Sequence, residues 1–129
     1  MNEFTELKIA KKLCEWVKKL GKRHPELLLL FATPNTSTDF FLPVPRWGYH
    51  GLFIKIEPEL SENEELSKIQ FRSTEKDWLK NLKDQGYLIV ITYGFADTVK
   101  LILTYLNPEN YQRNLIKQLF KDYMRWEFD

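Results

Sequence analysis

The chain has 129 residues, of which 43% are hydrophobic and 29% charged, and its formal net charge is +1. Length and composition predict one folded domain, 1–129, and exclude disorder over most of it. The longest apolar run, Leu27–Ala32, is too short for a membrane span, no basic segment leads into a signal-peptide core, and the single cysteine forms no internal disulfide. We therefore expect a cytoplasmic protein without membrane association.

Residues 3–21 have the period of an amphipathic helix that ends at Gly21. Its apolar positions recur at intervals of three and four residues and are Leu7, Ala10, Leu13, Cys14, Val17 and Leu20. In this pattern Cys14 is a small core residue. The other face carries Lys11, Lys12, Lys18, Lys19 and Lys22. That face is either solvated or a phosphate-binding surface.

Three strands are expected next. The continuous apolar run Leu27–Ala32 lies between prolines and is typical of a buried strand. The stretch Asp39–Glu57 predicts two further strands around the turn Pro45–His50. Alternation within the second of these puts Leu52, Ile54 and Ile56 on one face and Phe53, Lys55 and Glu57 on the other. Asp39, at the start of the partner strand, can face Lys55 and Glu57 across the hairpin.

The segment from Glu57 to Glu65 contains five glutamates and no basic residue. Pro58 ends strand pairing there, so this segment is either a solvated loop or an acidic surface for a basic protein partner. Beyond it, Ser73 or Thr74 can cap a helix that ends at Gly86. This helix has Trp78, Leu79 and Leu82 on one side.

The last part of the chain predicts a strand and two helices. Tyr87–Tyr93 is β-branched and apolar, as in a central strand, and Gly94 leads into a helix over about 96–106. Asn107–Pro108 can start a C-terminal helix over 107–129. Its apolar stripe includes Tyr111, Leu115, Leu119 and Tyr123, and Trp126 and Phe128 extend it. This stripe either docks on the chain's own core or forms a homodimer or partner face.

Several short motifs match one protein family. They are His24-Pro-Glu-Leu27, Pro34-Asn35, Asp39 at the start of a strand, Gln85-Gly-Tyr87, Tyr93-Gly94 and Tyr105-Leu106. On these motifs residues 5–106 resemble the VRR-NUC branch of the PD-(D/E)xK nucleases. The resemblance implies an α/β nuclease-like core in the order helix, three strands, helix, strand, helix, with the C-terminal helix as an addition. It also implies a Mg²⁺- or Mn²⁺-dependent phosphodiesterase site, in which Glu6 and Asp39 bind the metal.

The sequence departs from that family's pattern at four points. Lys55 stands where the family has a metal-binding glutamate, and Glu57 stands where it has the catalytic lysine. Thr38 replaces a proline, Glu75 replaces a glutamine that reaches the site, and the link after Asn35 is short. The exchange puts an ammonium group near the metal position, and two unit charges about 4 Å apart repel by roughly 4 kcal/mol at an effective dielectric near 20.

Two functions therefore remain open. The first is a catalytically degenerate nuclease-fold protein, without a cofactor, that binds or inhibits a macromolecule in a phage or mobile-element setting. A protein partner is favoured over nucleic acid, because the acidic segment would repel phosphates. The second is an active Mg²⁺- or Mn²⁺-dependent DNA endonuclease with a rearranged site. Its catalytic residues would be Asp39, Lys55, Glu57 and Glu75, and its metal ligands Glu6, Asp39 and Glu57.

Overall fold

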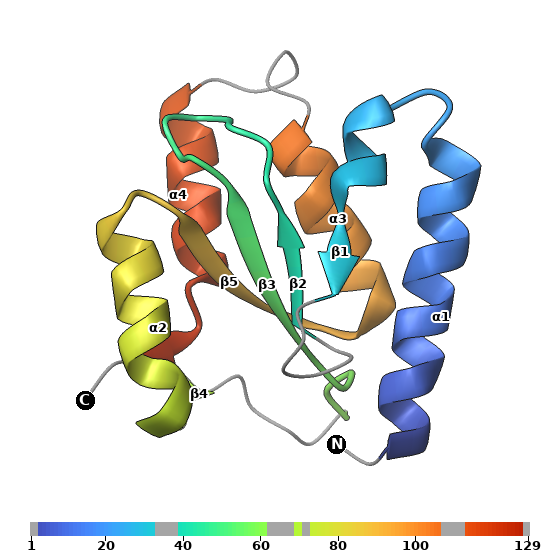
Figure 1. Cartoon of the computed structure of the whole chain (residues 1–129), viewed down its shortest axis with the longest axis horizontal. Helices are drawn as coiled ribbons and strands as arrows, with labels where there is room; N and C mark the ends of the chain where they lie inside the picture. Colours follow the sequence, from blue (N-terminus) through green and yellow to red (C-terminus); the bar gives the residue numbers. More distant parts are fainter. Residues whose placement is uncertain (1–2, 33–38, 62–68, 71–72, 107–112, 128–129) are drawn as a thin grey trace.

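The computed structural model describes residues 3–32, 39–61, 69–70, 73–106 and 113–127. Within these residues the chain is mixed α/β, with four α-helices and a four-stranded mixed sheet in the order β1-β2-β3-β5 (Figure 1). The strands are β1 (Phe31–Ala32), β2 (Asp39–Leu42), β3 (Leu52–Glu57) and β5 (Leu88–Tyr93). The pairs β1–β2 and β2–β3 are antiparallel, whereas β3 and β5 are parallel. No helix in the described part of the chain is long and apolar enough to span a membrane.

The helices pack on both faces of the sheet (Figure 1). They are α1 (Glu3–Leu20), α2 (Ser73–Asp84), α3 (Gly94–Leu106) and α4 (Arg113–Tyr123). One apolar cluster joins β3 to α1, α3 and α4, and includes Leu13, Ile54, Leu101 and Phe120. A smaller cluster joins Phe53 of the same strand to Leu79 of α2. The predicted alternation along β3 is therefore confirmed.

The apolar run that we expected to be a buried strand is mostly exposed. Pro25–Leu29 forms a 3₁₀ helix, η1, and the strand β1 is confined to Phe31–Ala32. Leu27 is buried, but Leu28, Leu29 and Phe31 are 62%, 52% and 51% exposed. The prediction of a buried strand is wrong here. Pro25 at the first helical position, followed by the acidic Glu26, is a helix-start pattern that overrides the apolar composition.

The strand β5 lies at one end of the sheet, so the prediction that it is central is wrong. It is nevertheless buried along most of its length. Its outer edge is covered by the C-terminal segment, because Trp126 Nε1 donates a hydrogen bond to the Ile89 carbonyl at 2.7 Å. Arg125 Nη1 likewise donates to the Ile91 carbonyl at 3.4 Å. A covered edge keeps a strand from pairing with another chain.

Arg125 fixes this C-terminal segment in place. Its Nη1 atom lies 2.9 Å from Asp97 Oδ2, and its guanidinium group stacks on the rings of Tyr93 and Tyr123 at 5.3 and 4.8 Å from their centroids. Beyond Arg125, the strand β6 (Trp126–Glu127) pairs in parallel with β4 (Ile69–Gln70) as a separate two-stranded sheet. The C-terminal segment is thus held by charge, by aromatic stacking and by backbone pairing.

Further sequence-based expectations for the helices need correction. Cys14 is exposed on α1 and is not a core residue. The last helix ends at Tyr123, so Trp126 belongs to β6 and does not extend the helical stripe. Phe120 and Tyr123 are buried in the chain's own core, so a homodimer could not use these two rings without opening that core. Phe128 and the expected cap at Asn107–Pro108 lie outside the described residues.

Candidate functional site

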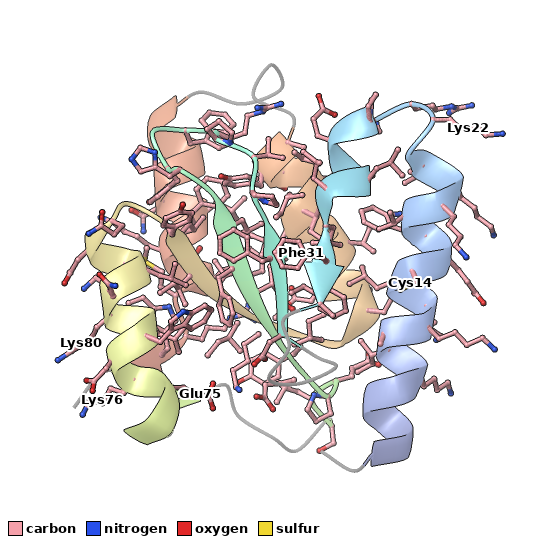
Figure 2. All side chains as sticks on the ribbon, in the orientation of Figure 1. Cys14, Lys22, Phe31, Glu75, Lys76 and Lys80 are labelled. Carbon is pink, nitrogen blue, oxygen red and sulfur yellow. The ribbon has the colours of Figure 1, made fainter. Side chains whose placement is uncertain are left out.

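Three charged side chains meet on the face of the sheet that α2 covers. Lys55 in β3 is the register partner of Asp39 in β2, which confirms the pairing expected from the sequence. Its Nζ atom lies 3.8 Å from Asp39 Oδ1 and 3.8 Å from Glu75 Oε2. Glu75 stands in the first turn of α2 (Figure 2). These three residues are called the charged triad below.

Burial makes the charged triad electrostatically important. Asp39 is only 1% exposed, and the side chains of Lys55 and Glu75 are 18% and 15% exposed. A carboxylate removed from water in this way is stable only when a cation or hydrogen-bond donors lie beside it. The nearby N-terminus of α2 also favours the negative charge of Glu75. Lys55 therefore supplies one positive charge to a site that contains two carboxylates.

Of the other predicted site residues, the structure describes the side chain of Glu57 but not that of Glu6. Glu57 lies two residues after Lys55 on the same face of β3, half-buried and in register with Tyr93 of β5. Glu6 is in α1, but its side chain lies outside the described residues, as does Thr38. The structure therefore brings together Asp39, Lys55 and Glu75. The register of β2 and β3 explains why Asp39 lies beside Lys55.

The family resemblance implies a divalent metal, and the charged triad provides a test of that implication. Mg²⁺ requires oxygen ligands at about 2.0–2.1 Å in near-octahedral geometry. Here the ammonium group of Lys55 lies within 3.8 Å of an oxygen from each carboxylate. A dication about 4 Å from that ammonium would be repelled by roughly 8 kcal/mol at an effective dielectric near 20. The charged triad taken alone is therefore a poor site for a divalent metal next to Lys55. The side chain of Glu6, another implied ligand, lies outside the described residues.

The structure also has a groove that the sequence did not predict. This groove of about 320 Å³ runs between α1 and β1, and its lining includes Leu13, Cys14 and Phe31. Figure 2 labels Cys14 on α1 and Phe31 on β1, one on each side of this groove. The helix-start pattern at Pro25 accounts for the exposed Leu28 and Leu29, but these residues do not line the groove. The groove depends on how α1 packs against β1 and Phe40, which no local sequence pattern indicates.

The chain matches no protein-family model, and comparisons with curated proteins and with solved structures gave no match either. The order of its elements is α1, η1, β1, β2, β3, β4, α2, β5, α3, α4 and β6. Apart from the 3₁₀ helix η1 and the two-residue strand β4, the part from α1 to α3 follows the order helix, three strands, helix, strand, helix that the resemblance implies. The charged triad and this order are the observations from which a function can be inferred.

Proposed function

We propose that this chain is a catalytically degenerate, VRR-NUC-like protein with a PD-(D/E)xK nuclease-like core that acts by binding another macromolecule. The observation that carries the proposal is the position of Lys55 Nζ, 3.8 Å from both Asp39 Oδ1 and Glu75 Oε2. The order of the elements supports the same assignment. A binding or inhibitory protein of a phage or mobile element fits this description.

Metal-assisted phosphodiester cleavage requires carboxylates that hold the metal and a lysine that faces the scissile phosphate. In this chain the lysine lies between the carboxylates instead. Asp39 is only 1% exposed, so a substrate that approaches from solvent would have little access to its carboxylate. The charged triad therefore serves to hold β2, β3 and α2 together, and the binding function lies on another surface.

A protein partner is favoured over a nucleic acid. Nucleic-acid affinity comes largely from Lys and Arg residues that displace counterions from phosphates. The chain leaves β3 through Glu57 and Glu59, and the remaining glutamates of that acidic segment lie outside the described residues. Exposed Leu28, Leu29 and Phe31 supply apolar surface of the kind that protein interfaces bury.

Plasmid nicking tests the proposal directly. Supercoiled plasmid would be incubated with the full chain in Mg²⁺ or Mn²⁺, and with the variants Asp39→Ala and Asp77→Ala. We expect no nicked product in any sample. Asp77 is the matched control because it is an exposed aspartate on α2. Metal-dependent nicking that Asp39→Ala abolishes and Asp77→Ala leaves intact would show an active endonuclease, the alternative function.

A charge-restoring variant provides the complementary measurement. Lys55→Glu combined with Glu57→Lys restores the family's order of charges on β3. We expect the melting temperature of this variant to rise when Mn²⁺ is added, because its carboxylates are no longer neutralised by a neighbouring ammonium group. The unchanged chain should show no such rise. An equal rise in both proteins would indicate that Lys55 does not obstruct the metal.

A further inference from the structure

The groove between α1 and β1 is apolar and open to solvent. Its lining includes Leu13, Val17, Leu30, Phe31 and Phe40. Its volume of about 320 Å³ is roughly twice that of the ~150 Å³ cavity that accommodates a benzene molecule, so it has room for two large apolar side chains. Leu30, which also lines the groove, joins β1 to η1, where Leu28 and Leu29 add exposed apolar surface outside the groove.

The two edges of the sheet differ in how far other residues cover them. The outer edge of β5 is covered by Arg125 and Trp126, whose side chains donate to its carbonyl groups. At the opposite edge, both residues of β1 are exposed, and β2 is the strand with which β1 pairs in the described sheet. An exposed apolar edge strand is a surface on which a segment of another chain can dock. The groove lies directly beside this edge.

The rim of the groove is basic. Lys18 lines it, and Lys11 lies on the same side of α1 because residues seven apart are separated by about two helical turns. Both side chains are exposed. Glu15 is the one exposed acidic side chain among those of α1 that the structure describes. It lies four residues after Lys11 and three before Lys18, on the same side of the helix, so these three residues carry two positive charges and one negative charge. An occupant of this groove would therefore meet positive charge next to apolar surface.

We propose that the groove between α1 and β1 binds a segment of a partner protein that carries two large apolar residues with acidic residues beside them. This inference rests on the proposed function, from which it takes a protein as the partner. A second copy of the chain is a poorer occupant, because a twofold contact would bring the same lysines of both copies together. A nucleic acid is poorer as well, because it would cover the apolar lining with charged phosphates.

Peptide selection on the full chain tests the proposal. A display library of random peptides would be selected on the protein, and the enriched peptides would be measured by fluorescence anisotropy. We expect them to contain two large apolar residues and at least one Asp or Glu. Phe31→Asp should weaken their binding about tenfold or more, because Phe31 lines the groove and a carboxylate there would repel the acidic peptide. Lys18→Glu should weaken it about fivefold, as reversal of a rim charge does.

Two matched variants serve as controls. Lys19→Glu makes the same change one residue further on, where the side chain points to another side of α1 because successive residues are about 100° apart. Trp78→Asp makes the apolar-to-acidic change at an exposed ring on α2. Both should bind the peptides as the unchanged chain does. Melting temperatures would show that all variants are folded, and Lys18→Glu tests the groove even if Phe31→Asp unfolds the protein.

Several results would overturn the proposal. They are a selection that yields no peptide dependent on Phe31, enriched peptides without acidic residues, or unchanged binding to Lys18→Glu. A free chain that is dimeric, and that Phe31→Asp makes monomeric, would assign the groove to a second copy instead. None of these results produces nicked plasmid. The failure of this inference is therefore distinguishable from the failure of the proposed function, which metal-dependent nicking alone would reveal.

Discussion

Asp39, at the start of β2, is a buried carboxylate, because only 1% of the residue is exposed. Removing one partner of a buried ion pair leaves the other charge without compensation, which costs about 3–5 kcal/mol. Replacing both partners together is much less harmful. Lys55 is therefore expected to matter for folding whatever the protein binds.

The stability of Lys55→Met tests this role. We expect its free energy of unfolding to fall by about 3 kcal/mol, the lower end of that range because the lysine side chain is 18% exposed. Urea unfolding would measure the change. Lys80→Met, on the outer side of α2 in Figure 2, should change it by less than about 0.5 kcal/mol. Asp39→Asn combined with Lys55→Met should recover part of the loss, and no recovery would contradict the pairing.

Tyr105 provides a prediction about pH. Its side chain is fully buried and donates a hydrogen bond to the Val44 carbonyl at 2.7 Å. Burial raises the pKa of Tyr105 to about 12, whereas an unfolded tyrosine titrates near 10. The unfolded chain therefore loses its proton first as the pH rises. The stability that this tyrosine contributes is complete below about pH 10 and is lost between about pH 10 and 12.

Comparison with Tyr105→Phe isolates this effect. Between about pH 10 and 12 the unchanged chain should lose roughly 2 kcal/mol more stability than the variant. Urea unfolding at several pH values would measure both proteins. Tyr123, whose pKa is also raised to about 12, is present in both and cancels from the difference. Parallel stability curves would show that the Tyr105 hydroxyl is not shielded from solvent in the folded state.

The turns show how single residues shape the elements around them. The tip of the β2–β3 hairpin has Arg46 bridged to Tyr49, with Trp47 at φ 58° and Gly48 at φ 86° between them. Positive φ at both central residues is the arrangement that suits the twist of a hairpin. Trp47 adopts it despite its side chain, because its Nε1 atom donates to the Tyr105 carbonyl at 2.9 Å. The hairpin tip is thereby tied to the end of α3.

Two glycine variants separate backbone strain from steric conflict. Gly48 has φ +86° and open space around its Cα, so Gly48→Ala should destabilise the protein by about 1 kcal/mol through backbone strain alone. Gly86 has φ +92°, and an added Cβ would lie 2.7 Å from His50 Cδ2. Gly86→Ala should therefore cost more than Gly48→Ala. Thermal unfolding would measure both, and His50→Ala should remove the excess from Gly86→Ala.

At the scale of the whole molecule, the sequence predicted the four α-helices, the strands β2, β3 and β5, and the face on which each β3 residue lies, but not η1, β4 or β6. It also predicted that Asp39 meets Lys55, because alternation and strand register are local properties. It did not predict that β5 is an edge strand. A continuous apolar strand is expected to be buried on both faces and along its edges. The outer edge of β5 is covered by Arg125 and Trp126, which lie more than thirty residues further along the chain. Such a distant contact leaves no local pattern.

Shortening the chain tests that cover. A chain that ends at Met124 lacks Arg125 and Trp126 and exposes the outer edge of β5. We expect it to melt at a lower temperature and to self-associate, because an uncovered apolar edge pairs with other chains. Light scattering coupled to size exclusion would measure its mass. A chain that ends at Glu127 keeps both side chains and should behave like the full chain, and equal behaviour of the two shortened chains would refute this role.

The exposed position of Cys14 has a practical consequence. It is the only thiol in the sequence, and it lines the groove between α1 and β1. A maleimide or disulfide reagent would therefore modify the protein at a single known atom without any engineered substitution. The rate of modification of Cys14 in the native chain would then report what fraction of the time a bound partner covers the groove.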